Sequence, residues 1–324
     1  MKNKKRWIAL LLSLQMGLGH FYIGKYKKAF LFALLPFFIY FVMFYLLQDM
    51  KFAPIIGWVL IIPLWIYTVI DIWRSFPIKA DEELLKYSKW YFVLLFLTFI
   101  IFVSILWNRF APIRAFSMPS TAMEKTLFRG DMIMVNRKSD IKRGDVVVFH
   151  YPLNPQIFYI KRMIAKGGDE VIYANRELLV HFKEGDEYIS KNYSKEFIKK
   201  YRDKLWVKNP YMIKNKNINY SLKDKNRESL FEMLVKTYIG GISKGMQPIY
   251  IEDKNLKTYQ IDGKEINAFY IKIKDNNYFM VGDNRENSND SRFWGEVNQQ
   301  YIFGVAKVVY LNYIKPSRIG IKIK

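Results

Sequence analysis

The sequence contains no cysteine and only three histidines in 324 residues. The lack of cysteine excludes disulfides and thiolate metal sites. The three histidines, His20, His150 and His181, are scattered along the chain, so a histidine-based zinc site or a Ser–His–Asp triad has little support. We therefore expect neither a metal ion nor another cofactor.

Acidic residues are scarce relative to basic ones, with 29 Asp and Glu against 51 Lys and Arg, a net charge of +22. Such a charge favours contact with nucleic acid or with an anionic membrane surface. No nucleic-acid-binding motif accompanies the charge, so we expect no nucleic-acid partner and interpret most of the lysines as a solvated surface. Membrane lipid is the expected contact of the basic residues that flank apolar segments.

Apolar residues crowd into the first third of the chain. Three charge-poor stretches, 29–47, 54–70 and 90–107, approach the roughly 20 residues that a membrane-spanning helix needs. A further apolar stretch, 7–23, follows a basic start but lacks a small-x-small cleavage site. We expect this stretch to lie in the membrane interface or to re-enter the membrane.

The distribution of basic residues predicts the orientation of these spans. Lys25, Lys27 and Lys28 precede the first span, whereas only Lys51 lies between the first and the second. Four basic residues lie between the second and the third: Arg74, Lys79, Lys86 and Lys89. The positive-inside rule places the first and last of these groups in the cytoplasm. The pattern predicts a multi-pass protein of the cytoplasmic (inner) membrane whose residues after 110 are extracytoplasmic.

The N-terminal stretch GLGHFYIGKYKKAF resembles part of a small two-span membrane module that occurs fused to varied proteins. We assign no role to His20 in it. Asp71, near the end of the second span, is expected to pair with a Lys or Arg at the interface, although an intramembrane ion site is the functional alternative.

The pattern changes to short β-rich runs after residue 110. These runs lie at 131–135, 145–149, 157–164, 278–281, 304–310 and 319–323. Runs of this length divided by Gly, Asp and Asn predict a β domain. Between 171 and 278 the chain is rich in lysine, with possible helices at 194–204 and 227–237 and weak strands at 248–252 and 269–273.

Four sequence blocks occur in this β-rich part. They are FSMPSTAMEKTLFRGD at 116–131, RGDVVVFHYP at 143–152, IKRMIAKGGDEV at 160–171 and MVGDNRENSNDSRFWG at 280–295. In order and spacing they resemble the blocks of bacterial type I signal peptidases, membrane-bound serine/lysine endopeptidases that remove signal peptides from exported precursors. The resemblance implies a mostly β chain: an antiparallel β-barrel-like catalytic core at 111–324 with an inserted secondary domain at about 172–277, preceded by an α-helical transmembrane region at 1–110. It implies signal peptides of exported precursors as partners, with contact to the secretion machinery as a further expectation.

One position departs from the family pattern. In Pro-Ser-x-Ser-Met the second serine is the nucleophile, and here that position is Ala122, between Ser120 and Met123. A methyl group cannot attack a carbonyl carbon. We favour a deliberate Ser→Ala change that traps substrate or blocks self-cleavage. A natural pseudoenzyme, which binds signal peptides or exported chains without cutting them, is the second explanation.

The resemblance also implies roles for the neighbouring residues. Lys161 matches the general base, which requires burial to lower its pKa from about 10.4. On a strand, Lys161 and Arg162 would point in opposite directions, one inward and one to solvent. Ser120 matches a hydroxyl that assists the Ala122 N–H in binding the oxyanion, and Ser288 matches a serine that hydrogen-bonds and orients the lysine.

The remaining matched residues are expected to support the site. Asp290 and Arg292 match a structural ion pair, and Met123 matches a residue that packs at the substrate cleft or membrane surface. The turn that holds this region is expected at Asp283, Asn284 and Arg285.

Overall fold

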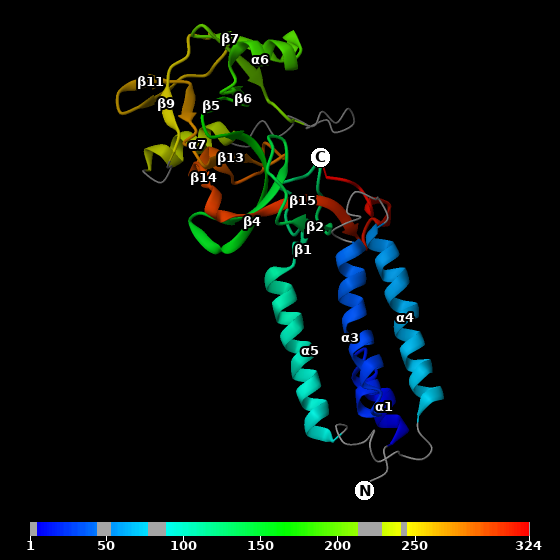
Figure 1. Cartoon of the computed structure of the whole chain (residues 1–324). Helices are drawn as coiled ribbons and strands as arrows, with labels where there is room; N and C mark the ends of the chain where they lie inside the picture. The colour runs from blue at the N-terminus through cyan, green and yellow to red at the C-terminus, as the bar shows by residue number, and fades with distance from the viewer. Residues whose placement is uncertain (1–4, 44–52, 77–88, 213–228, 241–244, 324) are drawn as a thin grey trace. The chain divides into compact units, whose positions relative to one another are not determined.

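The structure is a computed structural model that describes residues 5–43, 53–76, 89–212, 229–240 and 245–323, with the backbone alone at 53–55, 58 and 108 (Figure 1). The chain divides into two compact units, which we describe separately. The first comprises Met1–Ala115 and Lys307–Lys322, and the second comprises Phe116–Ala306 and Ile323–Lys324.

The first unit is helical. Its helices are α1 (Arg6–Leu12), α2 (Leu18–Tyr22), α3 (Tyr26–Phe41), α4 (Ala53–Ser75) and α5 (Trp90–Phe110). Within the described residues, one helix is long and apolar enough to cross a membrane, α5 over Trp90–Trp107, with a mean hydropathy of 2.4. The predicted span 54–70 falls within α4, and residues 44–47 of the span 29–47 lie outside the described residues. A membrane anchor is therefore supported, and the number of spans stays a prediction.

The apolar stretch 7–23 forms the two short helices α1 and α2 in place of one continuous helix. The indole N–H of Trp65 in α4 donates to the Ser13 carbonyl at 3.1 Å. The Phe21 ring of α2 stacks on Phe96 of α5 with centroids 4.4 Å apart. The stretch is thus packed against two longer helices, and its depth in a membrane stays a prediction.

Asp71 is paired, as expected from the sequence. The Lys28 ammonium donates to both Asp71 carboxylate oxygens at 2.8 Å. His20, to which no role was assigned, is fully buried and its Nε2 lies 2.9 Å from Asp71 Oδ2. Asp71 is the one carboxylate in the described part of this unit, and its polar contacts join α4 to α2 and α3.

A seven-stranded sheet carries the sequence blocks. Its order is β1 (Ile113–Ser117), β2 (Met132–Asn136), β15 (Ile302–Leu311), β3 (Val146–Tyr151), β4 (Asn154–Lys166), β13 (Asn277–Val281) and β14 (Val297–Asn298). The β-branched run 146–148 and Phe149 are fully buried in β3, which pairs antiparallel with β15 and β4. A continuous apolar run of this length suits a strand with neighbours on both sides.

A six-stranded sheet forms most of the segment between the third and fourth blocks. Its order is β7 (Ile198–Tyr201), β8 (Lys204–Lys208), β6 (Glu177–His181), β5 (Glu170–Ala174), β12 (Ala268–Lys272) and β9 (Gln247–Ile249). The strands β10 (Tyr259–Ile261) and β11 (Lys264–Ile266) form a separate hairpin. The helices of this unit are α6 (Gly185–Asn192), α7 (Leu230–Ile239) and α8 (Ser291–Trp294), with 3-10 turns η2 (Lys195–Phe197) and η3 (Gln299–Tyr301).

One hydrophobic core joins the two sheets. It combines Ile164 of β4 and Phe279 of β13 with Tyr173 of β5, Phe269 of β12 and Phe231 of α7. Because the segment 172–277 contributes to this core, it is packed onto the strands that carry the blocks. Every strand pair with a described register is antiparallel, which confirms the mostly β fold.

Two local predictions are wrong. The lysine-rich stretch 194–204 is not a helix: η2 is followed by β7, and Arg202 and Asp203, both at positive φ, turn the chain into β8. A two-residue turn with φ positive at both positions matches the twist of a hairpin. The stretch 319–323 contributes a single bridge, Val308 to Lys322, in place of a strand, after the 3-10 turn η4 (Pro316–Arg318).

Candidate active site

Ala122 lies in a turn between β1 and β2. The Leu127 N–H donates to the Met123 carbonyl at 2.8 Å, and the side chains of Met123 and Leu127 are fully buried. These two apolar anchors hold the turn against the protein, while Ala122 remains partly exposed and Ser120 is exposed. Met123 therefore packs into the core beneath the turn, and a direct role at a substrate cleft stays a prediction.

The turn at 283–287 is hydrogen-bonded to the turn that contains Ala122. The Asn284 N–H donates to the Ala122 carbonyl at 3.1 Å, and the Asn284 side-chain amide donates to the Thr121 carbonyl at 3.1 Å. The Asn287 amide donates to the Thr121 hydroxyl at 3.0 Å. Over the described chain the Ala122 N–H makes no hydrogen bond, so this donor is available to a ligand.

Gly282 lies against both Ser288 and the backbone of Ala122. A Cβ atom at this position would lie 2.1 Å from Ser288 Oγ and 2.6 Å from the Ala122 carbonyl oxygen. Only a residue without a side chain allows these groups to approach so closely. The structure thereby brings together Ala122 and Ser288, which are far apart in the sequence.

Lys161 is buried on β4. It is 5% exposed, its backbone pairs with Val147, and its ammonium lies 5.1 Å from the Tyr159 ring centroid. Desolvation lowers the pKa of Lys161 to about 8, while the charge of Asp290 raises it and that of Arg292 lowers it further. A buried lysine with this pKa is partly neutral near pH 8 and can accept a proton.

Ser288 is buried beside the turn at 122, but its hydroxyl makes no well-oriented hydrogen bond to any described residue. The predicted hydrogen bond from Ser288 to Lys161 is therefore not formed in this structure. The Ser288 hydroxyl is near enough to Asp290 to help lower the pKa of that carboxyl. An orienting role for Ser288 stays a prediction.

Arg162 is buried, so the expectation that one of Lys161 and Arg162 faces solvent is wrong. Both faces of β4 are covered, and Arg162 is 2% exposed. Its guanidinium donates to Asp283 in a bidentate pair at 2.8 and 2.7 Å and to the Thr126 hydroxyl at 2.9 Å. The Thr126 hydroxyl also donates to Asp283. Arg162 thus links β4 to both turns of the site, a contact that the sequence did not indicate.

Asp290 and Arg292 form a second buried pair. Arg292 donates to Asp290 at 2.8 and 2.9 Å, and the Gly282 N–H donates to Asp290 at 3.0 Å. Burial raises the pKa of Asp290, but the charge and hydrogen bonds of Arg292 overcome this effect and hold it below its ordinary value. The Arg292 guanidinium also lies 5.2 Å from the ring centroid of Tyr173. A paired carboxylate can remain ionised in the interior because its charge is compensated.

Arg285 has fewer partners. It is 6% exposed, and its Nε and Nη1 atoms have no hydrogen-bond partner among the residues that the structure describes. Desolvation lowers the pKa of Arg285 to about 10. The described residues contain no group of three or more metal-ligating side chains.

We predict that Gly282→Ala disrupts the site. The added methyl group would overlap Ser288 and the Ala122 carbonyl, and overpacking of this kind costs about 1–3 kcal/mol of stability. The measurement is thermal unfolding together with hydrogen exchange of residues 118–128. Gly240→Ala is the matched control, because its Cβ would have no contact closer than 3.4 Å. Equal behaviour of the two variants would contradict the prediction.

We predict that Lys161→Met stabilises the protein more at pH 7 than at pH 10. The folded-state pKa of about 8 lies below the ordinary 10.5, so the unfolded state binds the proton more tightly and stability rises with pH between these values. Below pH 8 the full cost of the buried charge is present. The stabilisation should be about 2–3 kcal/mol greater at pH 7 than at pH 10, measured by denaturant unfolding.

Lys161→Arg is the control for this measurement, because it keeps a buried cation at both pH values. It should be less stable than Lys161→Met at both pH values. Because neither arginine nor methionine titrates in this range, the difference in stability between the two variants should be the same at pH 7 and pH 10. A pH-independent gain for Lys161→Met would contradict the burial argument.

The residues of this site lie in a part of the chain that is similar to known proteins. Residues 89–311 match the family described as signal peptidase, peptidase S26. The chain is 34% identical over 231 residues to signal peptidase I of Helicobacter pylori (strain J99), covering 61% of this chain and 75% of that protein. It is 34% identical over 241 residues to signal peptidase I of Aquifex aeolicus, covering 68% and 84%.

A solved structure of signal peptidase I from Enterococcus faecalis aligns with 52% of this chain and 97% of its own, at 20% identity and a TM-score of 0.24. That score is too low to carry a structural argument. The family match extends from the start of α5 to the end of β15 and includes both turns and Lys161. With α5 as its candidate span, the chain is a membrane-anchored protein. It belongs to the signal peptidase family, peptidase S26, the serine endopeptidases that cleave signal peptides.

Proposed function

We propose that this chain is a signal peptidase I in which Ala122 occupies the position of the nucleophilic serine and Lys161 is the general base. The observation that carries the proposal is the buried Lys161 with its lowered pKa, on a strand joined through Arg162 to the turn at 122. A chain with Ala122 retains the site but lacks the hydroxyl that would attack the peptide carbonyl.

The proposed reaction follows from restoring that hydroxyl. The neutral Lys161 amine takes the proton of a serine at 122 while the serine oxygen attacks the carbonyl carbon of the substrate. The backbone N–H of residue 122, which has no partner among the described groups in the Ala122 chain, and the Ser120 hydroxyl stabilise the resulting oxyanion. The protonated lysine then gives its proton to the leaving amine, and water hydrolyses the acyl-enzyme in a second cycle of the same groups.

The other matched residues act on the geometry of the site in this proposal. Ser288 orients the Lys161 amine, and the Asp290–Arg292 pair holds the turn that contains it. Asp283, Asn284 and Arg285 form the turn that grips residues 121 and 122. The substrates are signal peptides of exported precursors with small residues at positions −1 and −3, the first and third residues before the cleaved bond.

A second function uses the same site without chemistry. A natural pseudoenzyme would bind signal peptides or exported chains and release them uncut, and Ala122 itself favours this alternative because its methyl group cannot form an acyl-enzyme.

We predict that Ala122→Ser cleaves precursor peptides and that its kcat/KM rises with pH through about 8, because only neutral Lys161 can accept the serine proton. Adding Lys161→Met or Lys161→Arg should lower the rate by about 10²–10⁴-fold or more. The measurement is the cleavage rate in detergent, with peptides that carry bulky residues at −1 and −3 as controls.

The two functions give different outcomes in this experiment. If Ala122→Ser stays inert while the Ala122 chain binds precursor peptides in preference to the bulky controls, the pseudoenzyme is correct. Absence of both cleavage and binding would contradict both functions.

We also propose that the chain is a multi-pass protein of the cytoplasmic membrane with residues after 110 outside. The cysteine-free sequence allows a direct test. A single cysteine at the exposed Lys254 should react with a membrane-impermeant maleimide in spheroplasts, whereas one at the exposed Lys27 should react only after permeabilisation. Labelling of position 27 but not of position 254 in intact spheroplasts would show the opposite orientation and contradict the proposal.

A further inference from the structure

The turn at 142–145 is bonded to β4 beside Lys161. The Gly144 N–H donates to the Met163 carbonyl at 2.8 Å, and the Gly144 carbonyl accepts a hydrogen bond from Arg162. The same guanidinium forms the bidentate pair with Asp283. The position of the Gly144 backbone therefore helps to determine where Arg162 lies, and through it the turns of the site.

The ring of Tyr211 lies directly on Gly144. A Cβ atom at position 144 would be 2.8 Å from Tyr211 Cδ1 and 3.1 Å from Cε1, and the φ of Gly144 is +94°. A side chain at 144 would displace the ring. Tyr211 comes from the predicted insertion, so a residue outside the four blocks covers a backbone group that supports the site.

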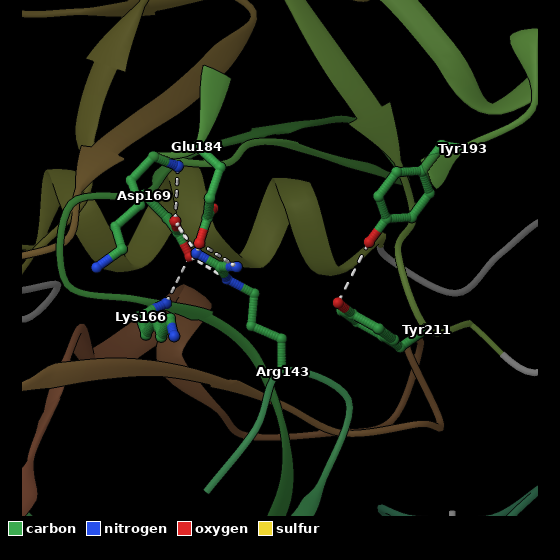
Figure 2. Close-up of polar contacts among 7 residues, drawn as sticks. Arg143, Lys166, Asp169, Glu184, Tyr193 and Tyr211 are labelled. Atoms are coloured by element: carbon green, nitrogen blue, oxygen red, sulfur yellow. Dashed lines mark hydrogen bonds and ion pairs between the residues drawn. The ribbon is translucent and has the colours of Figure 1, made fainter. Parts of the chain in front are cut away.

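Tyr211 is held in an unfavourable backbone conformation. Its φ is +59°, a region that bulky residues rarely adopt. Its hydroxyl lies 3.2 Å from the Tyr193 hydroxyl (Figure 2), and the Tyr193 ring stacks on Phe182 with centroids 5.5 Å apart. Strain of this kind persists only where the surroundings fix the residue, and it occurs preferentially at functional sites.

The residue before Tyr211 contacts the second turn of the site. The Pro210 carbonyl accepts a hydrogen bond from Arg285 at 3.4 Å. Asn209 fixes this segment to β6, since its N–H donates to the Leu178 carbonyl and its side-chain oxygen accepts from the Leu178 N–H at 2.9 Å. Residues 210 and 211 thus reach both the turn at 144 and the turn at 285.

Arg143, the residue before Gly144, binds two carboxylates (Figure 2). Its guanidinium donates to Asp169 at 2.8 and 2.6 Å and to Glu184 at 3.1 and 3.0 Å, and it lies 4.7 Å from the Phe182 ring centroid. Phe182 is the residue on which Tyr193 stacks. Arg143 and, through Tyr193, Tyr211 therefore both connect the turn at 142–145 to Phe182 of the insertion.

We propose that Tyr211 is a positioning residue for the site: by covering Gly144 it fixes Arg162, and with it the turns around Ala122 and Lys161. The inserted segment is then part of the apparatus that holds the site in its working geometry. The aromatic ring is the acting group, and the hydroxyl contact with Tyr193 only adds support. The part of this inference that concerns catalysis rests on the proposed function.

The first test needs no activity and uses the full chain with Ala122. Hydrogen exchange of residues 118–128 and 280–288 should become about tenfold faster in Tyr211→Ala and stay within about twofold in Tyr211→Phe, which keeps the ring. The β10–β11 hairpin serves as an internal reference. Unchanged exchange in Tyr211→Ala, or equal acceleration in the reference hairpin, would overturn the proposal.

The second test uses Ala122→Ser. Tyr211→Ala should lower kcat by about 10- to 100-fold with KM within about twofold, since small displacements of reacting groups cost rates of this size. Tyr211→Ala should also raise the pH at which kcat/KM reaches half its maximum, from about 8 to a higher value, because a more hydrated Lys161 has a higher pKa. If Tyr211→Ala only reduced the fraction of folded protein, the rate would fall but the midpoint of the pH dependence would stay at about 8. That result would overturn the proposal.

In this second test Tyr211→Phe, which keeps the ring, should retain both the rate and the pH midpoint of the chain with Tyr211. If Ala122→Ser has no activity with any precursor, the proposed function fails, and the exchange measurement alone decides whether Tyr211 positions the turns.

Discussion

The close approach of two turns at Gly282 is the constraint on which the site depends. One turn contains Ala122, the other spans 283–287 and is followed by Ser288, and they meet at a glycine that leaves no side chain between Ala122 and Ser288. The hydrogen bond from the Asn284 N–H to the Ala122 carbonyl exists only because of this approach. The Ala122 N–H is unpaired among the described groups. The contact with Asn284 therefore holds the turn and leaves the Ala122 N–H as a donor for a substrate.

Buried charge gives the site its chemical character. In each of the pairs Arg162–Asp283 and Asp290–Arg292, the guanidinium and the carboxylate lie within hydrogen-bond distance of each other, which offsets the cost of burying them. Lys161 has no such partner at hydrogen-bond distance in the described chain, and desolvation dominates its titration. The same interior therefore holds two paired carboxylates and lowers the pKa of one unpaired lysine.

Much of the site could be predicted because it lies in four short blocks with a recognisable order. The turn at 283–285, the Asp290–Arg292 pair and the buried Lys161 follow from those blocks. The burial of Arg162 does not, because alternation along a strand shows that two neighbours face opposite ways but not that both faces are covered. The hairpin at 198–208 was missed because its lysines obscure the two-residue turn at Arg202 and Asp203. Tyr211 lies outside every block, and only the tertiary structure reveals its contact with Gly144.

The two ends of the six-stranded sheet have a consequence for how the protein meets extended chains. The terminal strand β7 carries the exposed Lys200, and the terminal strand β9 carries Pro248, which has no N–H to donate. Charged residues and proline at sheet edges discourage the pairing of a foreign strand. The two edges of this sheet are therefore poor templates for an extended chain, so an added strand would find few main-chain partners there.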